Sequence, residues 1–193
     1  GCELTDIFTI DEPNPQNINL SSLNTEICEG EITTINSSGS FTNYIWTEAI
    51  NGVIFGNNTS SLNVNTTGIY SVTGISSVGC EVSSPTIEIT VYDNPVFNIN
   101  GLTDVLTGNT QTYYTQNNSN TYQWSIEPEE MGDIVSSDNG SDVQIIWNLE
   151  GQAELFLAQT NDNGCTTTET ISIDITLSVG IDEIENELDF VVF

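Results

Sequence analysis

The sequence contains no lysine, no arginine and no histidine, against 28 aspartate and glutamate residues in 193 positions. Nucleic-acid binding is therefore excluded, because neutralising the phosphate backbone requires Lys or Arg. Attraction to anionic membrane surfaces is excluded for the same reason. The carboxylates repel one another unless salt, divalent cations or distance relieves the repulsion. We expect an extracellular setting rich in salt or calcium, with neutral drift in an acidic family as the alternative.

The absence of Lys, Arg and His also excludes most catalytic mechanisms. Without His or Lys there is no base to activate a serine or cysteine nucleophile. Without Arg or Lys there is no side-chain cation to stabilise an oxyanion or a phosphate. Four scattered cysteines and no His make a zinc site improbable. We therefore expect a protein that is not an enzyme, with paired carboxylates as the only remaining catalytic option.

Long apolar runs are missing as well. No stretch of 18 or more apolar residues occurs, so the sequence predicts no transmembrane segment. The chain does not begin with Met or with a signal-peptide core, and we expect that any export signal was removed or lies outside this sequence. Because 37% of the residues are hydrophobic, the chain can still bury a core.

A turn ending in Gly-Cys occurs three times, starting at Gly1, Gly79 and Gly164. Each copy is followed by alternating apolar and polar residues, as in "TIEITV" and "TISIDI". Alternation with a period of two is typical of a half-buried strand. The cysteines are 78 and 85 residues apart, and a period near 80 with short strands predicts tandem β-sandwich modules.

The repeat extends upstream of these turns. Trp46 follows Cys28 by 18 residues, and Trp124 follows Leu106 by the same distance. Both tryptophans lie in a strand pattern with an aromatic residue two positions earlier, in "YIW" and "YQW". Two tryptophans at a shared offset from shared landmarks indicate a duplicated module, in which each one is a core anchor.

The cysteines predict a disulfide between Cys28 and Cys80, which bracket one module. Closing a loop of this length is worth about 4 kcal/mol in the chain-entropy model. It implies an oxidising compartment. Cys165 has Leu106 where a partner would stand, and the natural partner of Cys2 would lie upstream of this sequence. A Cys2–Cys165 bridge is the alternative, which we consider geometrically unfavourable.

The segments "ICEGE", "YIW", "TTGIYSVTGISSVGCE" and "ITV" together resemble the Ig-like and PKD-like repeats of large exported proteins of Bacteroidetes. The opening "GCELTDIFTIDEP" is similar to the end of an SprB-type gliding-adhesin repeat. The closing "SVGIDEIENELDFVVF" resembles the lead-in to a C-terminal sorting domain. The resemblance implies a stalk or adhesive array on the bacterial cell surface. It also implies the type IX secretion and outer-membrane machinery as a partner of the C-terminal region.

On this basis we predict an all-β chain of tandem Ig/PKD-like β-sandwich modules. Residues 1–13 are the last strand of a truncated preceding repeat, 14–93 an Ig-like sandwich and 94–176 a PKD-like sandwich. Residues 177–193 are an acidic linker towards a sorting domain.

The densest group of candidate ligands consists of Glu127, Glu129, Glu130 and Asp133, in the loop "EPEEMGD". The favoured interpretation is a solvated acidic loop. A calcium site is the alternative, because hard cations prefer clustered oxygen ligands from flexible loops. A glycosidase-type carboxylate pair is the remote third interpretation.

Two further loops contain oxygen-rich residues. "NDNG", residues 161–164, is favoured as a hairpin turn over a calcium loop because it ends in Asn-Gly. "SDNGSD", with Asp138 and Asp142, has the same two interpretations. Neither loop has the Glu that an EF-hand requires.

Exposed aromatic residues would bind sugars by stacking. Tyr113, Tyr114 and Tyr122 are the candidates in the second module, although Tyr122 pairs with Trp124 and is expected in the core. Phe55 lies at an expected hairpin tip, where local packing is the usual explanation.

The leading functional hypothesis is a non-enzymatic extracellular stalk or adhesin segment. A calcium- or carbohydrate-binding module, with a surface or glycan ligand, is the first alternative. An accessory region of an exported hydrolase is the second.

Overall fold

The computed structural model describes residues 17–54 and 56–178. This part of the chain is built of β-strands and one three-residue 3-10 helix, as predicted. None of its helices is long and apolar enough to cross a membrane. The chain divides into two compact units between Asp93 and Asn94. The predicted strand at 1–13 and nearly all of the predicted linker at 177–193 lie outside the described residues.

The first unit contains two sheets that face each other across a core. One sheet has the order β1 (Leu20–Ser22), β3 (Thr33–Ser37), β6 (Ser61–Val64). The other has the order β2 (Glu26–Cys28), β9 (Ile87–Tyr92), β7 (Gly68–Ile75), β4 (Asn43–Glu48), β5 (Gly52–Val53), and β8 (Glu81–Ser83) also pairs with β7. Both sheets contribute alternate residues to one apolar cluster, among them Ile35, Trp46, Tyr70 and Ile89. Alternation therefore gives each strand one buried face.

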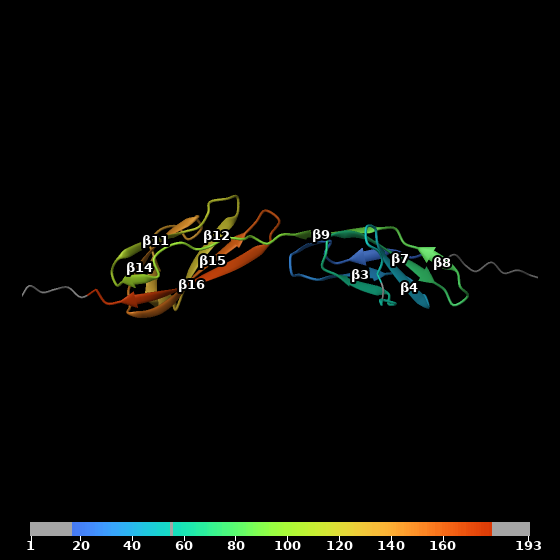
Figure 1. The fold of residues 1–193 in the computed structure, drawn as a ribbon, viewed down its shortest axis with the longest axis horizontal. Helices are drawn as coiled ribbons and strands as arrows, with labels where there is room; N and C mark the ends of the chain where they lie inside the picture. The colour runs from blue at the N-terminus through green and yellow to red at the C-terminus, as the bar shows by residue number, and fades with distance from the viewer. Residues whose placement is uncertain (1–16, 55, 179–193) are drawn as a thin grey trace, which may run out of the picture. The chain divides into compact units, whose positions relative to one another are not determined.

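The second unit repeats this plan. One sheet has the order β10 (Asp104–Leu106), β16 (Thr166–Thr176), β15 (Gly151–Thr160), β12 (Thr121–Glu127). The opposing sheet has the order β11 (Thr110–Tyr114), β14 (Asp142–Trp147), β13 (Gly132–Ile134) (Figure 1). The 3-10 helix Glu129–Met131 connects β12 of one sheet to β13 of the other. Each unit is thus a β-sandwich with immunoglobulin-like strand order.

The duplication is visible in the strand pairing. In each unit a short early strand pairs in parallel with the last strand, β2 with β9 and β10 with β16. Cys28 is the last residue of β2 and lies opposite Tyr92, whereas Leu106 is the last residue of β10 and lies opposite Thr176. The two sequence landmarks therefore occupy the same place in the two sandwiches.

The predicted core anchors are confirmed. Trp46 and Trp124 are 0% and 1% exposed. Each indole Nε1–H donates a hydrogen bond to a backbone carbonyl in the same unit, Trp46 to Thr59 and Trp124 to Gly140, both at 2.9 Å. A buried indole N–H needs such a partner. The shared offset in the sequence thus reports a shared packing arrangement.

A third tryptophan, Trp147, was not singled out as a core residue from the sequence. It is fully buried, and its Nε1–H donates to the hydroxyl oxygen of Tyr113 over 3.1 Å. The two rings meet edge to face with centroids 6.2 Å apart. Burial raises the pKa of the Tyr113 hydroxyl above its ordinary value. The alternation Val143, Ile145, Trp147 was the available sequence signal.

The Gly-Cys turns also match. The amide of Gly79 donates to the carbonyl of Ser76, and that of Gly164 to Asn161, both at 3.0 Å. The φ angles of the two glycines are +85° and +82°, a conformation that favours glycine. Residues 161–164 connect β15 to β16, so the hairpin-turn interpretation of "NDNG" is confirmed.

The predicted Cys28–Cys80 disulfide is wrong. Cys80 is an exposed free thiol, whereas Cys28 and Cys165 are both disulfide-bonded. Cys28 lies opposite Tyr92 at the end of β9, while Cys80 precedes β8 at the start of the same extended run. At about 3.3 Å per residue, these positions are roughly 30–40 Å apart. A disulfide needs Cα atoms within about 7 Å. The expectation that Cys165 lacks a partner is wrong as well.

Glu48, at the end of β4, is a carboxylate that the fold buries to 5% exposure. Its Oε2 accepts a hydrogen bond from the amide of Asn51 at 2.7 Å, whereas Oε1 is buried without a partner among the described residues. The backbone N–H groups of Asn51 and Ile50 hold the pKa of the Glu48 carboxyl below its ordinary value. The charged form therefore stabilises the turn that follows β4.

We expect Glu48→Gln to lower the thermal midpoint of the first unit at pH 7, and this difference to shrink towards pH 3. Because the folded pKa is lowered, the stabilisation is present above the unfolded pKa of about 4.3 and is lost as the pH falls through the folded value. Thermal unfolding between pH 3 and pH 7 measures the difference. Glu88→Gln, at an exposed position of β9, is the matched control. A pH-independent difference for Glu48→Gln would contradict this account.

Candidate functional site

The predicted carboxylate group lies where β12 ends and the chain crosses to β13. Glu127 is the last residue of β12, Glu129 and Glu130 begin the 3-10 helix, and Asp133 lies in β13. The Asp133 carboxylate accepts a hydrogen bond from the side-chain amide of Asn148 at 2.8 Å. In the part of the chain that the structure describes, no three acidic or cysteine side chains are placed to hold a metal ion. The four carboxylates are therefore neighbours in sequence that do not converge on one point.

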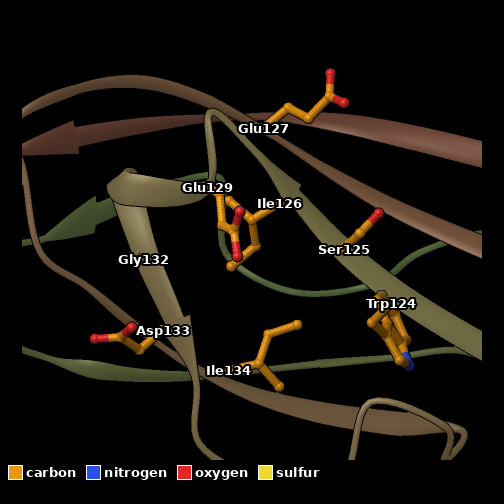
Figure 2. A pocket seen from close by; sticks show the side chains of 8 residues that line it. All are labelled: Trp124, Ser125, Ile126, Glu127, Glu129, Gly132, Asp133 and Ile134. Carbon is orange, nitrogen blue, oxygen red and sulfur yellow. The ribbon is translucent and has the colours of Figure 1, made fainter.

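A cleft of about 530 Å³ separates β12 from β13 at this position. Its walls include Trp124, Ile126 and Glu127 from β12, and Gly132 and Ile134 from β13. Figure 2 shows the side chain of Glu129 beside Ile126 in the gap between the two strands, whereas Glu127 and Asp133 turn away from it. The cleft thus has a mixed lining, with Ile126 and Ile134 on its walls, one carboxylate inside and another at the rim.

The backbone of β12 presents unpaired groups to this cleft. In the part of the chain that the structure describes, β12 pairs with β15 on one side and has no strand on the other. The amide of Trp124 donates to the carbonyl of Asp138 in a loop, at 2.9 Å, so Trp124 directs its backbone groups away from β15. Because hydrogen-bonded and non-hydrogen-bonded pairs alternate in an antiparallel ladder, Ile126 also directs its N–H and C=O away from β15.

The same reasoning applies to β13, whose one strand partner among the described residues is β14. The amide of Val135 donates to Gln144, and the amide of Asn148 donates to Met131, so the odd-numbered residues face β14. Gly132 and Ile134 therefore direct their backbone groups outward. Two sheet edges that have no strand partner among residues 94–178 thus border one cleft.

Gly132 permits close packing behind this edge. A Cβ atom built on it would lie 2.9 Å from the ring of Trp147 and 3.1 Å from the carbonyl oxygen of Ile146. Glycine is therefore required for β13 to lie flat against the core. Gly132 is itself buried with Trp147 behind it, whereas Ile134 is half-buried.

Two of the three tyrosines proposed for sugar stacking are buried. Tyr113 is 0% exposed and Tyr122 is 8% exposed, the latter as expected for a core residue. Tyr114 alone of the three is exposed, at 53%. Phe55 lies outside the described residues. The three tyrosines do not form a stacking platform.

Asp138 and Asp142 make contacts that stabilise the fold. The Asp138 carboxylate accepts a hydrogen bond from the side-chain amide of Gln123 at 2.7 Å, and its carbonyl accepts from Trp124. Asp142 begins β14 and lies opposite Tyr114. Because Asp138 is engaged in these bonds, the loop closes over the first half of β12 and leaves only its second half open.

The open edge of β12 was not foreseen from the sequence. The alternation in "TYQWSIE" predicts a strand with one buried face, which is confirmed by the burial of Tyr122, Trp124 and Ile126. Whether a strand lies at an edge depends on which segments pair with it. Strand pairing depends on segments far apart in the sequence, so the local pattern of β12 does not show that its second half is an open edge.

No family model matches this chain, and no curated protein sequence does. Among solved structures the chain is similar to the three N-terminal domains of the Highly Immunogenic Outer Capsid protein of bacteriophage RB49. The identity is 17%, the match covers 83% of this chain and 59% of that chain, and the TM-score is 0.40. The chain therefore spans less than two thirds of that protein fragment.

It is also similar to the CbhA fibronectin(III)-like modules of Clostridium thermocellum, with 11% identity over 83% of this chain and 94% of that chain, at a TM-score of 0.39. A third likeness is to murine CEACAM1b, with 14% identity over 83% of this chain and 100% of that chain, at a TM-score of 0.36. All three TM-scores lie below 0.5, so the fold assignment rests on the strand order itself.

Proposed function

We propose that this chain is a segment of a non-enzymatic extracellular protein in which repeated sandwiches form a stalk or an adhesive array. The observation that carries the proposal is the duplication. The same sandwich is built twice, with matching parallel strand pairs, matching buried tryptophans and matching Gly-Cys turns. Repeated modules of this kind extend a polypeptide without requiring a new fold for each step.

Two further properties support an exported location. Cys28 and Cys165 are disulfide-bonded, and disulfides form and persist mainly in oxidising compartments. The net charge is −28 with no basic residue, so repulsion between like charges opposes self-association. Within this proposal, the finer assignment is a Bacteroidetes surface protein with SprB-type repeats, exported by the type IX machinery through its C-terminal region.

The alternatives receive less support from the geometry. A calcium-binding module would need converging oxygen ligands, and the candidate carboxylates at Glu127, Glu129, Glu130 and Asp133 do not converge. A carbohydrate-binding module would need exposed aromatic rings, and Tyr113 and Tyr122 are buried. The third alternative, an accessory region of an exported hydrolase, is not supported by any contact or site among the described residues.

The surface location is tested by labelling cells that produce the protein with a membrane-impermeant maleimide. Cys80 is an exposed free thiol, so we expect it to be labelled on intact cells. Cys28 and Cys165 should be labelled only after reduction, because both are disulfide-bonded. Peptide mapping by mass spectrometry locates each label.

Cys80→Ser is the control, since it separates the signal of this thiol from that of Cys2. Labelling of Cys80 only after cell lysis would overturn the extracellular assignment. Labelling of Cys28 and Cys165 without reduction would overturn the oxidised state.

A further inference from the structure

The two sandwiches differ at one equivalent edge. In the first unit the strand of the core tryptophan, β4, is covered by β5. Thr47 lies opposite Val53 and Glu48 opposite Gly52. The amide of Ile54 donates to the carbonyl of Trp46 at 2.8 Å. The edge of this sheet is therefore occupied by a short antiparallel strand of the same chain.

Residues 94–178 of the second unit contain no such strand. Trp124 corresponds to Trp46, and Ile126, two residues later, corresponds to Glu48. After Glu127 the chain passes through Pro128 and the 3-10 helix directly into β13 of the opposite sheet. In residues 94–178, β15 is the only strand that pairs with β12. The position that β5 fills in one unit is thus an open cleft in the other.

We propose that the β12 edge from Trp124 to Glu127 binds an extended polypeptide segment of a partner protein, in the place that β5 takes in the first unit. The partner segment alternates apolar and basic residues. It pairs with the outward N–H and C=O of Ile126 and donates to the carbonyl of Trp124, as Ile54 does to Trp46. There it replaces the long 3.4 Å hydrogen bond that the side-chain amide of Gln123 donates to this carbonyl. This adds one strand to the sheet.

The alternation follows from the two sides of the edge. Successive side chains of a strand point to opposite faces. One set would contact Ile126 and Ile134 on the inner wall of the cleft. The other would lie on the outer face beside Ser125 and Glu127, which are exposed. Apolar residues therefore suit the first set and polar or basic residues the second.

The charge selects the partner. Glu129 lies in the cleft and Glu127 at its rim (Figure 2), and the chain has no basic side chain to pair with either. A second copy of this chain carries the same charge of −28 and would be repelled. A Lys- or Arg-bearing segment is attracted to Glu127 beside its outer side chains and, at longer range, to Glu129 in the cleft, which raises its association rate.

Backbone geometry favours a polypeptide over a sugar. The free groups at Ile126 are a donor and an acceptor on one residue, which is the pattern that an antiparallel strand complements. The inference does not depend on the surface role proposed above, because it uses only the comparison of two edges within the chain.

The test is a titration of the ¹⁵N-labelled chain with three synthetic heptapeptides, followed by amide NMR shifts and hydrogen exchange. The first alternates Lys and Val (KVKVKVK), the second replaces each Lys by Glu, and the third is the Lys peptide with alternate backbone nitrogens methylated. We expect the Lys peptide to shift Ile126, Gly132 and Ile134 and to slow exchange at Ile126 at least tenfold. The methylated peptide should bind at least tenfold more weakly, and the Glu peptide should not bind.

The double variant Glu127→Gln with Glu129→Gln should weaken binding of the Lys peptide several-fold. The matched control, Glu81→Gln with Glu88→Gln, removes two exposed carboxylates of the first unit and should leave it unchanged. Equal binding of the methylated peptide, shifts spread over the whole acidic surface, or no binding at low salt would each overturn the proposal. If cellohexaose shifted the Ile126 amide and the Lys peptide did not, the site would bind a glycan, and the proposal of a polypeptide partner would be overturned.

Discussion

Replacing Trp124 by alanine is expected to destabilise the second unit by about 3–5 kcal/mol, the usual cost of removing a buried large aromatic side chain. Trp124 is 1% exposed and packs with residues of both sheets, including Leu155 and Val143. Its indole also donates to Gly140, and this hydrogen bond holds the loop before β14. Urea unfolding measures the loss, and hydrogen exchange read by mass spectrometry locates it in residues 94–178.

The duplicated module supplies a matched control. Trp46→Ala removes the equivalent side chain of the first unit and should place a loss of similar size in residues 17–93. The contrast between the two variants separates the two cores, because each tryptophan belongs to a different apolar cluster. A loss below 1 kcal/mol, or increased exchange in the first unit for Trp124→Ala, would contradict the assignment of Trp124 as an anchor of its own sandwich.

Gly101→Ala is expected to destabilise the second unit by about 2–4 kcal/mol, combining overpacking with backbone strain. A Cβ atom at this position would lie 2.3 Å from a ring carbon of Tyr113. The φ angle of Gly101 is +154°, which disfavours an L side chain. Tyr113 has no room to move, because it is fully buried and its hydroxyl accepts from Trp147.

Gly140→Ala is the control for this effect. Its nearest neighbour is the carbonyl oxygen of Asp142, 3.3 Å from the added Cβ, and no positive φ is required. Thermal unfolding should show a change of at most about 1 kcal/mol for Gly140→Ala. Equal stability of Gly101→Ala and Gly140→Ala would contradict the prediction, because the close approach of Gly101 to Tyr113 would then not constrain the fold.

The open edge of β12 gives the duplicated fold an asymmetry that bears on function. An exposed strand edge is a template for pairing with another chain. Natural proteins protect such edges with charge, and here Glu127 and Glu129 flank it. The same carboxylates that oppose pairing with another copy of this chain would attract a basic segment. One feature would thus give both protection and selectivity.

Much of the fold was determined by the sequence alone. Alternation in "TIEITV" and "TISIDI" identified β9 and β16, because a strand with one buried face must alternate. The shared offset to Trp46 and Trp124 identified the duplication, since a repeated packing arrangement keeps the spacing of its anchors. The turn at 161–164 was correct for a local reason, because Gly164 has a positive φ and the Asn161 side chain accepts hydrogen bonds from the amides of Asn163 and Cys165.

The tertiary structure alone decided what depends on distance between segments far apart in the sequence. Cys28 and Cys80 lie near the two ends of the module's sequence, but they are not partners. Cys28 lies opposite the end of β9 and Cys80 precedes β8, so the two cysteines lie at opposite ends of the sandwich. Clustering in sequence did not bring the carboxylates of Glu127, Glu129, Glu130 and Asp133 to one point, because the chain crosses from one sheet to the other among them. The open edge at Ile126 follows from the absence, in residues 94–178, of a strand in the place of β5. Local patterns record which face of a strand is buried, whereas strand partners are fixed only when the whole sandwich has folded.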